Sequence, residues 1–228
     1  IFDESELMYT DLNGDQISLD NENPPRITIA YQLLSMLLDK MYYSIRHCIQ
    51  CLVSFDDDIL VRYPFGPINP NSLNSCMKKE VCNSQSKLWD SLSFSCKEIT
   101  KFRKDVDGNE IYKNAQSRIL VISAGKDNGS SAKLHNVVEK LIKNKIVVDS
   151  VVLNTCDRCK KLCAACHATG GLSFRPKNIQ ECFDLAEQSA FFNYEERKIN
   201  PAPLIPGDKS TIPFHLESDQ ITKKFMKN

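Results

Sequence analysis

The sequence predicts an α/β fold: a doubly wound, mostly parallel six-stranded sheet with helices on both faces and one antiparallel edge hairpin strand. The main observation is the stretch 118–155, where two apolar, β-branched runs flank a segment with apolar residues at helical spacing. A strand, a helix and a strand joined by short loops form a parallel βαβ unit. The second observation is that strand and helix patterns alternate along the rest of the chain, which is typical of such a sheet.

The first elements follow from periodicity and turn residues. Residues 1–2 have the pattern of the end of a strand, so we expect further polypeptide ahead of them. Apolar residues at helical spacing predict a helix over 26–43. Residues 49–55 and 59–63 predict two strands, and the acidic turn 56–58 between them makes the pair a hairpin.

The middle of the chain holds a loop and the βαβ unit. Prolines, serines and asparagines predict a loop over 64–86, and an amphipathic pattern predicts a helix over 88–102. The strand 118–123 follows, and Ser130 or Ser131 is expected to cap the next helix.

The last elements are shorter. Residues 146–153 predict a strand, 162–169 a helix and 172–174 a short strand, and Asn178 can cap a helix that continues through residue 187. Beyond residue 197 the chain is rich in proline and charge. We therefore expect one domain over 1–197 and a tail or linker over 198–228.

Composition excludes several classes of partner. The formal net charge of the 228 residues is zero, so no basic field points to nucleic acid. No apolar run approaches the ~20 residues that cross a bilayer. We therefore expect a protein partner, no nucleic acid and no membrane insertion. The ten cysteines, several of them in predicted core elements, favour free thiols in a reducing, cytoplasmic compartment.

Several short motifs, taken in order, resemble those of a known family. They are Asp3-x-Ser5 after a strand, a long helix that opens Arg26-Ile27, LVSF at 52–55, LWDSL at 88–92, RILVIS at 118–123 with Gly125, VVDSVVL at 147–153 and ATGGLSF at 168–174. Together they resemble a von Willebrand factor A (vWA) domain over most of residues 1–197. The passages ATGGLSF and ERKINPAP are most similar to intracellular vWA domains of ubiquitin-pathway proteins.

The resemblance implies a metal-ion-dependent adhesion site at the carboxyl edge of the sheet, with Asp3, Ser5 and Ser86 as ligands. Such a site holds Mg²⁺ through oxygen atoms and leaves one position open for an acidic group of a partner. Two family ligands are missing, because Leu7 replaces a serine and Ala124 replaces an aspartate. The resemblance thus implies a degenerate site. We expect no cofactor, with Mg²⁺ at these three residues as an alternative.

Other acidic residues are expected at the same edge. Asp56, Asp57 and Asp58 follow a strand that should run parallel to the first, and Asp127 follows the third-loop position. Any of them could replace the missing carboxylate, although an acidic turn is more commonly only solvated. The predicted partner-binding surface consists of Asp3, Ser5, Asp56, Asp57, Asp58, Ser86 and Asp127.

A cluster of four cysteines, Cys156, Cys159, Cys163 and Cys166, predicts either Zn²⁺ or core packing. Thiolates in C-x-x-C pairs suit Zn²⁺, but here three residues separate the pairs, against roughly 12–20 in usual sites. The last three cysteines also lie at i, i+4 and i+7 of a predicted helix, which is the pattern of a core face. Structural thiols are the preferred interpretation, with zinc and redox or disulfide chemistry as alternatives.

No pattern of catalytic residues is present. None of the four histidines lies in a nucleophile or metalloprotease motif, and no glycine loop is placed to cradle phosphate. We therefore expect a non-catalytic protein–protein interaction domain of vWA type, an adaptor or scaffold with a degenerate metal site. One alternative is an accessory vWA domain of a ubiquitin-pathway enzyme whose catalytic domain lies outside this sequence. Another is a structural subunit of a large assembly.

Overall fold

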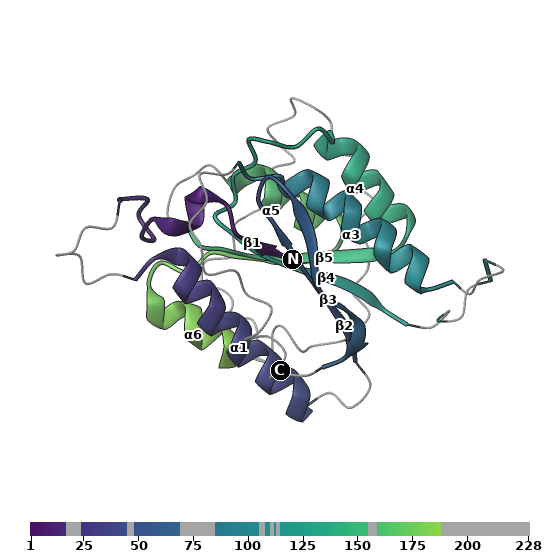
Figure 1. The fold of residues 1–228 in the computed structure, drawn as a ribbon, viewed down its shortest axis with the longest axis horizontal. Helices are drawn as coiled ribbons and strands as arrows, with labels where there is room; N and C mark the ends of the chain where they lie inside the picture. The colour runs from purple at the N-terminus through teal and green to yellow at the C-terminus, as the bar shows by residue number, and fades with distance from the viewer. Residues whose placement is uncertain are drawn as a thin grey trace.

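Figure 1 shows the computed structural model, in which a six-stranded sheet lies between two layers of helices. The structure describes residues 1–16, 24–44, 48–68, 85–104, 108–109, 112, 115–154 and 159–187. The predicted tail, the boundary at residue 197 and Cys156 lie outside these residues.

The strands follow the order β3-β2-β1-β4-β5-β6 across the sheet. Their bounds are β1 Phe2–Asp3, β2 Ile49–Phe55, β3 Ile59–Pro67, β4 Ser117–Ser123, β5 Ile146–Val152 and β6 Ser173–Phe174. The short β1 lies in the middle and runs parallel to both β2 and β4. Only β3 is antiparallel, and it forms one edge. The predicted mostly parallel sheet with one antiparallel edge hairpin strand is therefore confirmed.

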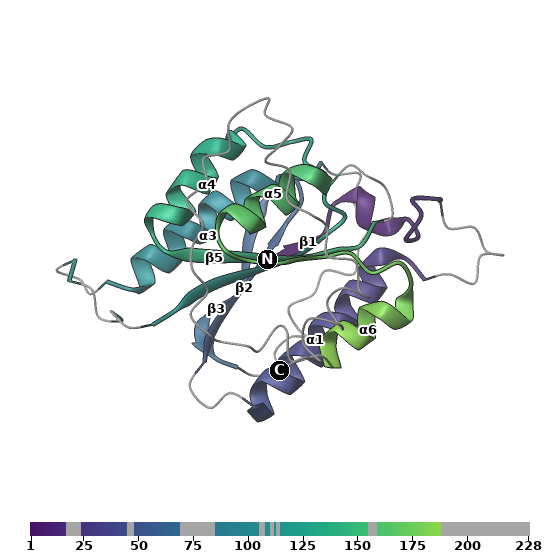
Figure 2. The same ribbon diagram turned by 180° about the vertical axis from the view of Figure 1, so that it is seen from behind.

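Helices cover both faces of the sheet, as Figures 1 and 2 show. One layer contains α1 (Arg26–Ser44) and α6 (Ile179–Glu187), and the other contains α3 (Leu88–Phe102), α4 (Leu134–Lys143) and α5 (Lys160–Ala168). Successive strand side chains point to opposite faces, so Phe2 packs in the core under α1 while Ile1 packs against the core under α3. No helix in the described ranges combines the length and the apolar character needed to cross a membrane.

The edge strand β3 is longer than predicted. The sequence predicts a strand ending at residue 63 and a loop from Pro64, whereas β3 continues to Pro67. Proline removes a backbone donor, which disrupts a central strand but is tolerated where no neighbour lies beyond the edge. The expected loop over 64–67 is therefore wrong, and residues 69–84 lie outside the described part of the chain.

One predicted helix cap is confirmed and one is wrong. The Asn178 side chain accepts a hydrogen bond from the Glu181 backbone N–H at 2.8 Å, as expected for the cap of α6. Helix α4 instead begins after Lys133 without a side-chain cap. Ser130 caps a different helix, α3, because its hydroxyl oxygen accepts from the N–H of Trp89.

Candidate functional site

Three segments meet at the carboxyl edge of the central strands. Because β1, β2 and β4 run parallel, the segments that follow them begin at the same edge. These segments are residues 3–9, the hairpin turn 56–58 and the loop 123–130. With residues 85–87, which precede α3, they form what we call the carboxyl-edge site.

Hydrogen bonds fix residues 85–87 between the other segments. The Gln85 N–H donates to Asp57 Oδ1 at 3.0 Å, and the Lys87 ammonium donates to the Asp57 carbonyl. On the other side, the Ser86 N–H donates to Asn128 Oδ1 at 2.6 Å, and the Asn128 N–H donates back to the Ser86 carbonyl at 3.1 Å. The loops that follow β2 and β4 are thus joined through Ser86.

Asp3 is the buried centre of the site. Its side chain is 0% exposed, its Oδ1 accepts from the Ser5 N–H at 3.0 Å, and its Oδ2 accepts from the Ser123 hydroxyl at 2.6 Å. Burial raises the pKa of the Asp3 carboxyl, and the hydrogen bonds from Ser123 and Ser5 oppose that shift. Among the described residues none forms an ion pair with Asp3, so its negative charge lacks a nearby compensating cation.

The hydroxyls of Ser5 and Ser86 are buried without hydrogen-bond partners. Both side chains are 0% exposed, and within the described ranges neither Oγ makes a hydrogen bond of good geometry, although the Ser5 side chain helps to oppose the rise in the pKa of Asp3. A buried hydroxyl in this state costs about 1–3 kcal/mol. Both hydroxyls lie at the edge that holds Asp3.

Leu7 and Ala124, which the resemblance places at two ligand positions, contribute no side-chain oxygen to the site. Leu7 lies in a 3-10 turn, η1 (Glu6–Tyr9), and its side chain packs against the core under α1. Ala124 is 1% exposed and belongs to the same core. Both side chains therefore pack in the core, and the loss of two metal ligands remains a prediction from the family resemblance.

Asp127 is engaged at the start of α3. Its Oδ1 accepts from the Ser130 hydroxyl at 2.5 Å and from the Trp89 N–H at 3.4 Å. A carboxylate at the N-terminus of a helix is stabilised by the backbone N–H groups and by the helix dipole. Asp127 therefore holds the loop after β4 onto α3, and this role explains its position without a metal.

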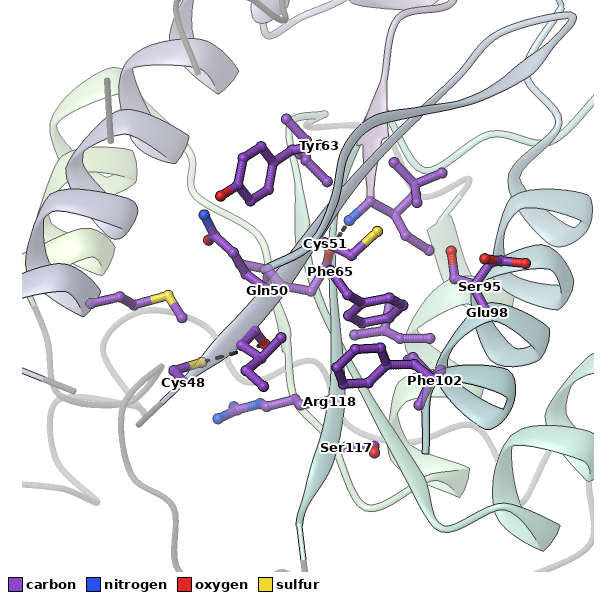
Figure 3. Close-up of a pocket in the computed structure, with 18 of the residues that line it drawn as sticks. Cys48, Gln50, Cys51, Tyr63, Phe65, Ser95, Glu98, Phe102, Ser117 and Arg118 are labelled. Atoms are coloured by element: carbon purple, nitrogen blue, oxygen red, sulfur yellow. Dashed lines mark hydrogen bonds between the residues drawn. The ribbon is translucent and has the colours of Figure 1, made fainter. Parts of the chain in front are cut away.

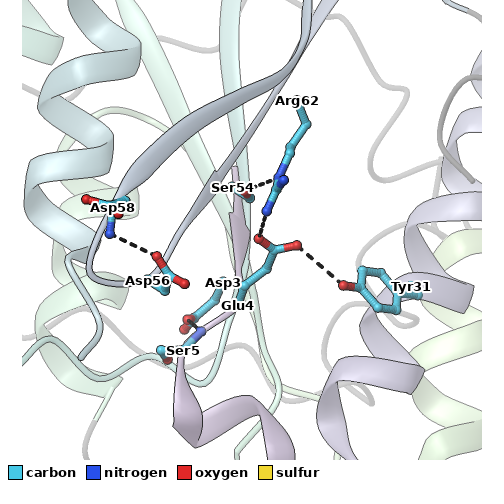
Figure 4. A network of polar contacts seen from close by, with 8 residues as sticks. All are labelled: Asp3, Glu4, Ser5, Tyr31, Ser54, Asp56, Asp58 and Arg62. Carbon is cyan, nitrogen blue, oxygen red and sulfur yellow. Dashed lines mark hydrogen bonds and ion pairs between the residues drawn. The ribbon is translucent and has the colours of Figure 1, made fainter. Parts of the chain in front are cut away.

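The acidic turn after β2 divides into a buried and an exposed part. Asp56 is 8% exposed and lies beside Asp3 and Ser5 in Figure 4, and its Oδ1 accepts from the Asp58 N–H at 2.8 Å. Asp57 and Asp58 are exposed. The prediction that this turn reaches the same edge as Asp3 is confirmed by the parallel pairing of β1 and β2.

A polar network that the sequence reasoning missed surrounds Glu4. Glu4 is 4% exposed, and its Oε2 lies 2.6 Å from the Arg62 guanidinium (Figure 4). Arg62 also donates to Ser54 Oγ at 2.7 Å, and the Tyr31 hydroxyl donates to Glu4 Oε1 at 3.4 Å. Burial raises the pKa of Tyr31. Glu4 lies between Asp3 and Ser5 in the sequence. A charged residue inside a motif expected to be buried could have indicated that a cationic side chain of this chain, here Arg62, forms an ion pair with it.

Three of the four clustered cysteines pack in the core. Cys159, Cys163 and Cys166 are 2%, 5% and 0% exposed, and the Cys166 thiol donates to Ser150 Oγ at 3.3 Å. Burial raises the pKa of the Cys163 and Cys166 thiols, whereas a zinc ligand must be a thiolate. Within the described ranges no group of three or more His, Cys, Asp or Glu side chains could hold a metal ion. The four-cysteine set itself includes Cys156, which lies outside those ranges.

Comparison of the sequence finds no matching family model and no matching curated protein. Comparison of the structure does find similar folds. The vWA domain of SpRpn10 has a TM-score of 0.58 at 12% identity, over 81% of this chain and 91% of that one. BatB from Bacteroides thetaiotaomicron has a TM-score of 0.56 at 12% identity, over 82% and 93%. A von Willebrand factor type A protein from Catenulispora acidiphila has a TM-score of 0.58 at 13% identity, over 83% and 40%.

The fold is that of a vWA domain. This result confirms the resemblance at the level of the fold, and these identities carry no more than that. For the metal that vWA domains imply, the donors present here fit only in part. Asp3 and the hydroxyls of Ser5 and Ser86 would hold Mg²⁺, which would supply the positive charge that Asp3 lacks and a binding position for an acidic group.

Proposed function

We propose that this vWA-type chain is a non-catalytic protein-interaction domain, an adaptor or scaffold, that binds its partner at the carboxyl-edge site. The observation that carries the proposal is the buried, uncompensated Asp3 beside the partnerless hydroxyls of Ser5 and Ser86. This arrangement retains the polar positions of a binding edge while Leu7 and Ala124 remove two metal ligands.

The exposure of the acidic residues indicates which of them a partner can touch. Asp3, Ser5 and Ser86 are 0% exposed, so a protein partner reaches them only through a bound group between the two molecules. Asp57 and Asp58 are exposed at the rim of the site. We therefore assign direct contact to these two carboxylates, which suit a partner with Lys, Arg or backbone N–H groups.

The test is a double variant, Asp57→Asn with Asp58→Asn, which removes two charges and nearly preserves side-chain shape. Proteins cross-linked to the native chain in cell extract are identified by mass spectrometry, and the affinity of the main one is then measured with purified components. We expect binding to weaken at least ~10-fold, because rim charges mainly steer and orient association. The weakening should shrink at high salt.

Glu139→Gln is the matched control, because Glu139 is an exposed carboxylate on α4, away from the site. It should leave the affinity unchanged. Equal affinity of the Asp57/Asp58 variant and the control would place the interaction surface elsewhere on the domain. A melting temperature within ~2 °C of the native value is required of both variants, so that a loss of binding is not a loss of fold.

A further inference from the structure

Two neighbouring helices carry exposed lysines on their outer surface. On α3 and just beyond its end, Lys97, Lys101 and Lys104 follow each other at spacings of four and three residues, so they lie on one side of the helix. Lys140 and Lys143 lie in the last turn of α4. All five side chains are exposed. We call these five lysines the basic face.

The packing of the two helices brings these lysines together. α3 and α4 lie side by side on one face of the sheet (Figures 1 and 2), and the Arg103 side chain joins their ends by donating to the Asn144 carbonyl at 3.0 Å. Burial raises the pKa of the Cys96 thiol on α3, and the charge of Lys140 opposes that shift. The Lys140 ammonium therefore lies close to α3, at the residue that precedes Lys97.

The lysines of the basic face lack counter-charges within this chain. No ion pair of the described residues includes any of the five. Glu98, the acidic residue next to Lys97, lines a cavity between α3 and the strands β2 and β4 (Figure 3), so it does not belong to the exposed lysine side of the helix. Glu139 is exposed on α4 one turn before Lys143, without an ion pair to it in the described ranges.

The stability of the two helices explains only part of the basic face. Cations in the last turn of a helix are stabilised by its dipole, which accounts for Lys101, Lys140 and Lys143. Lys97 lies one turn earlier, four residues before Lys101, and like charges at this spacing on a helix repel each other. The lysines of α3 therefore destabilise the helix when nothing is bound, and an anionic group bound between them would remove the repulsion.

The basic face has the dimensions of a short peptide segment. Lys97 and Lys104 are about 10 Å apart along the helix axis, and the axes of packed helices are about 8–10 Å apart. Four residues of an extended chain span about 13 Å. The face is also distant from the carboxyl-edge site, because α3 begins beside that site at Leu88 and Lys101 follows about 20 Å further along the helix.

The chemistry of the basic face suits carboxylates better than lipid or nucleic acid. Helices that lie on membranes combine lysines with exposed Trp, Phe or Leu, whereas none of the exposed large apolar residues in the described ranges belongs to α3 or α4. A formal net charge of zero gives no long-range attraction to nucleic acid. Lysine ammonium groups act as separate point charges, so they can pair with successive carboxylates of one segment.

We propose that the basic face binds a short acidic segment of a partner protein, with about four Asp or Glu residues lying across the lysines of α3 and α4. The proposal follows from the exposure of these lysines, their lack of ion pairs and the dimensions of the face. It does not depend on the carboxyl-edge site, and it gives the domain a second binding surface at the other end of α3. A domain with both surfaces holds two partners at once, as an adaptor does.

The experiment titrates the whole chain with the peptide acetyl-Gly-Glu-Glu-Glu-Glu-Gly-amide at low ionic strength and follows the amide signals by NMR. The variant Lys97→Gln with Lys140→Gln removes one lysine from each helix. Its matched control, Lys160→Gln with Lys161→Gln, removes two exposed lysines of α5 and changes the net charge equally. We expect the first variant to weaken binding at least ~5-fold and the control less than ~2-fold.

The same titration shows where the peptide binds. The amide signals of residues 97–104 and 139–145 should shift, and those of residues 56–58 should not. Binding should weaken as added salt screens the charges. The variant Asp57→Asn with Asp58→Asn should bind the peptide as the native chain does, so the two surfaces are tested separately.

Any of four results would overturn the proposal. The first is the absence of saturable binding at millimolar peptide, and the second is equal binding of a peptide with Gln in place of each Glu. The third is equal weakening by the two lysine variants, which would mean that the peptide responds to net charge and not to this face. The fourth is binding to phosphatidylserine vesicles but not to the peptide, which would make the partner of the face a membrane.

Discussion

At the scale of single residues, Asp3 is a carboxylate that is costly to ionise in the folded protein. Its carboxylate is fully buried, with hydrogen bonds from Ser5 and Ser123 but no ion pair within the described ranges. Burial removes the water that would solvate this charge, and the neutral donors of Ser123, Ser5 and Ala124 offset that loss only in part, so the pKa of Asp3 is raised. A group of this kind lowers the free energy of unfolding when it is ionised.

We predict that Asp3→Asn raises the melting temperature at pH 7. Between the ordinary pKa of 3.8 and the raised value, the folded protein retains a proton that the unfolded chain releases. The stability of the native chain therefore falls as pH rises through this interval, and the full loss is present above it. Asn removes the charge, so its advantage should shrink as pH falls toward ~4. Melts from pH 4 to 8 in EDTA check this, and a destabilised variant at every pH would contradict it.

At this scale the sequence predicted positions better than contacts. The resemblance placed Asp3, Ser5 and Ser86 at the carboxyl edge, and in the structure Asp3 ends β1 while Ser5 and Ser86 lie in the segments beside it. It could not show that Asp127 accepts from Trp89, or that Glu4 pairs with Arg62. Both contacts join segments far apart in sequence, and the direction of a side chain in a loop has no periodicity to reveal it.

At the scale of elements, the backbone of the turn between α5 and β6 packs directly against β5. Gly171 passes against β5, where a Cβ would lie 1.8 Å from the Val148 carbonyl oxygen. The Gly171 N–H donates to the Cys166 carbonyl at 2.8 Å, and the next N–H, of Leu172, donates to Asp149 Oδ1 at 2.7 Å. The turn is thus fixed by backbone contacts that cannot move aside.

We predict that Gly171→Ala costs about 3 kcal/mol or more, since the added methyl group overlaps backbone atoms of β5. Gly66→Ala is the control, because a Cβ there first meets the hydroxyl at the far end of the Tyr63 side chain on the edge strand, at 3.2 Å, and not the backbone of another strand. It should change the free energy of unfolding by less than ~1 kcal/mol. Urea titration measures both, and equal effects would mean that β6 can shift away from β5.

The bounds of an element were predicted well where its apolar periodicity is strong. They were predicted less well where contacts with other elements determine where it ends or how it is capped. The bounds of α3 match the sequence prediction, since its apolar stripe is regular. The end of β3 was missed because its prolines are acceptable only at a sheet edge, which is a property of the whole sheet. The cap of α4 was misassigned because the Ser130 hydroxyl accepts a hydrogen bond from the first turn of α3, a helix distant in the sequence.

At the scale of the whole molecule, the sheet has an apolar core on each of its two faces. Each face of the sheet has a continuous buried core, and Cys159 and Cys166 belong to the one under α3, α4 and α5. Neutral thiols in such a core behave as small apolar side chains. This view gives the cysteines a packing role.

We predict that excess EDTA leaves the melting temperature unchanged and that Zn²⁺ does not raise it, because the buried thiols are held in the neutral form. Mg²⁺ or Mn²⁺ should raise it only at millimolar concentrations, because one carboxylate and two hydroxyls give a weak site. Thermal melts in each ion check both statements. A fall in EDTA that Zn²⁺ restores would make the cysteine cluster a structural metal site.

The cap of α3 also has a consequence for the order in which the chain is made. The N–H groups of Trp89 and Asp90 are satisfied by Ser130, 41 and 40 residues later in the sequence. On a ribosome that adds about 5–20 residues each second, this helix emerges seconds before its cap. β1 likewise cannot pair on its second side until β4 has been synthesised, because Phe2 pairs with Ile122. The first half of the domain is therefore an unfinished sheet with an open side during synthesis, and the arrival of residues 117–130 closes the edge and the helix together.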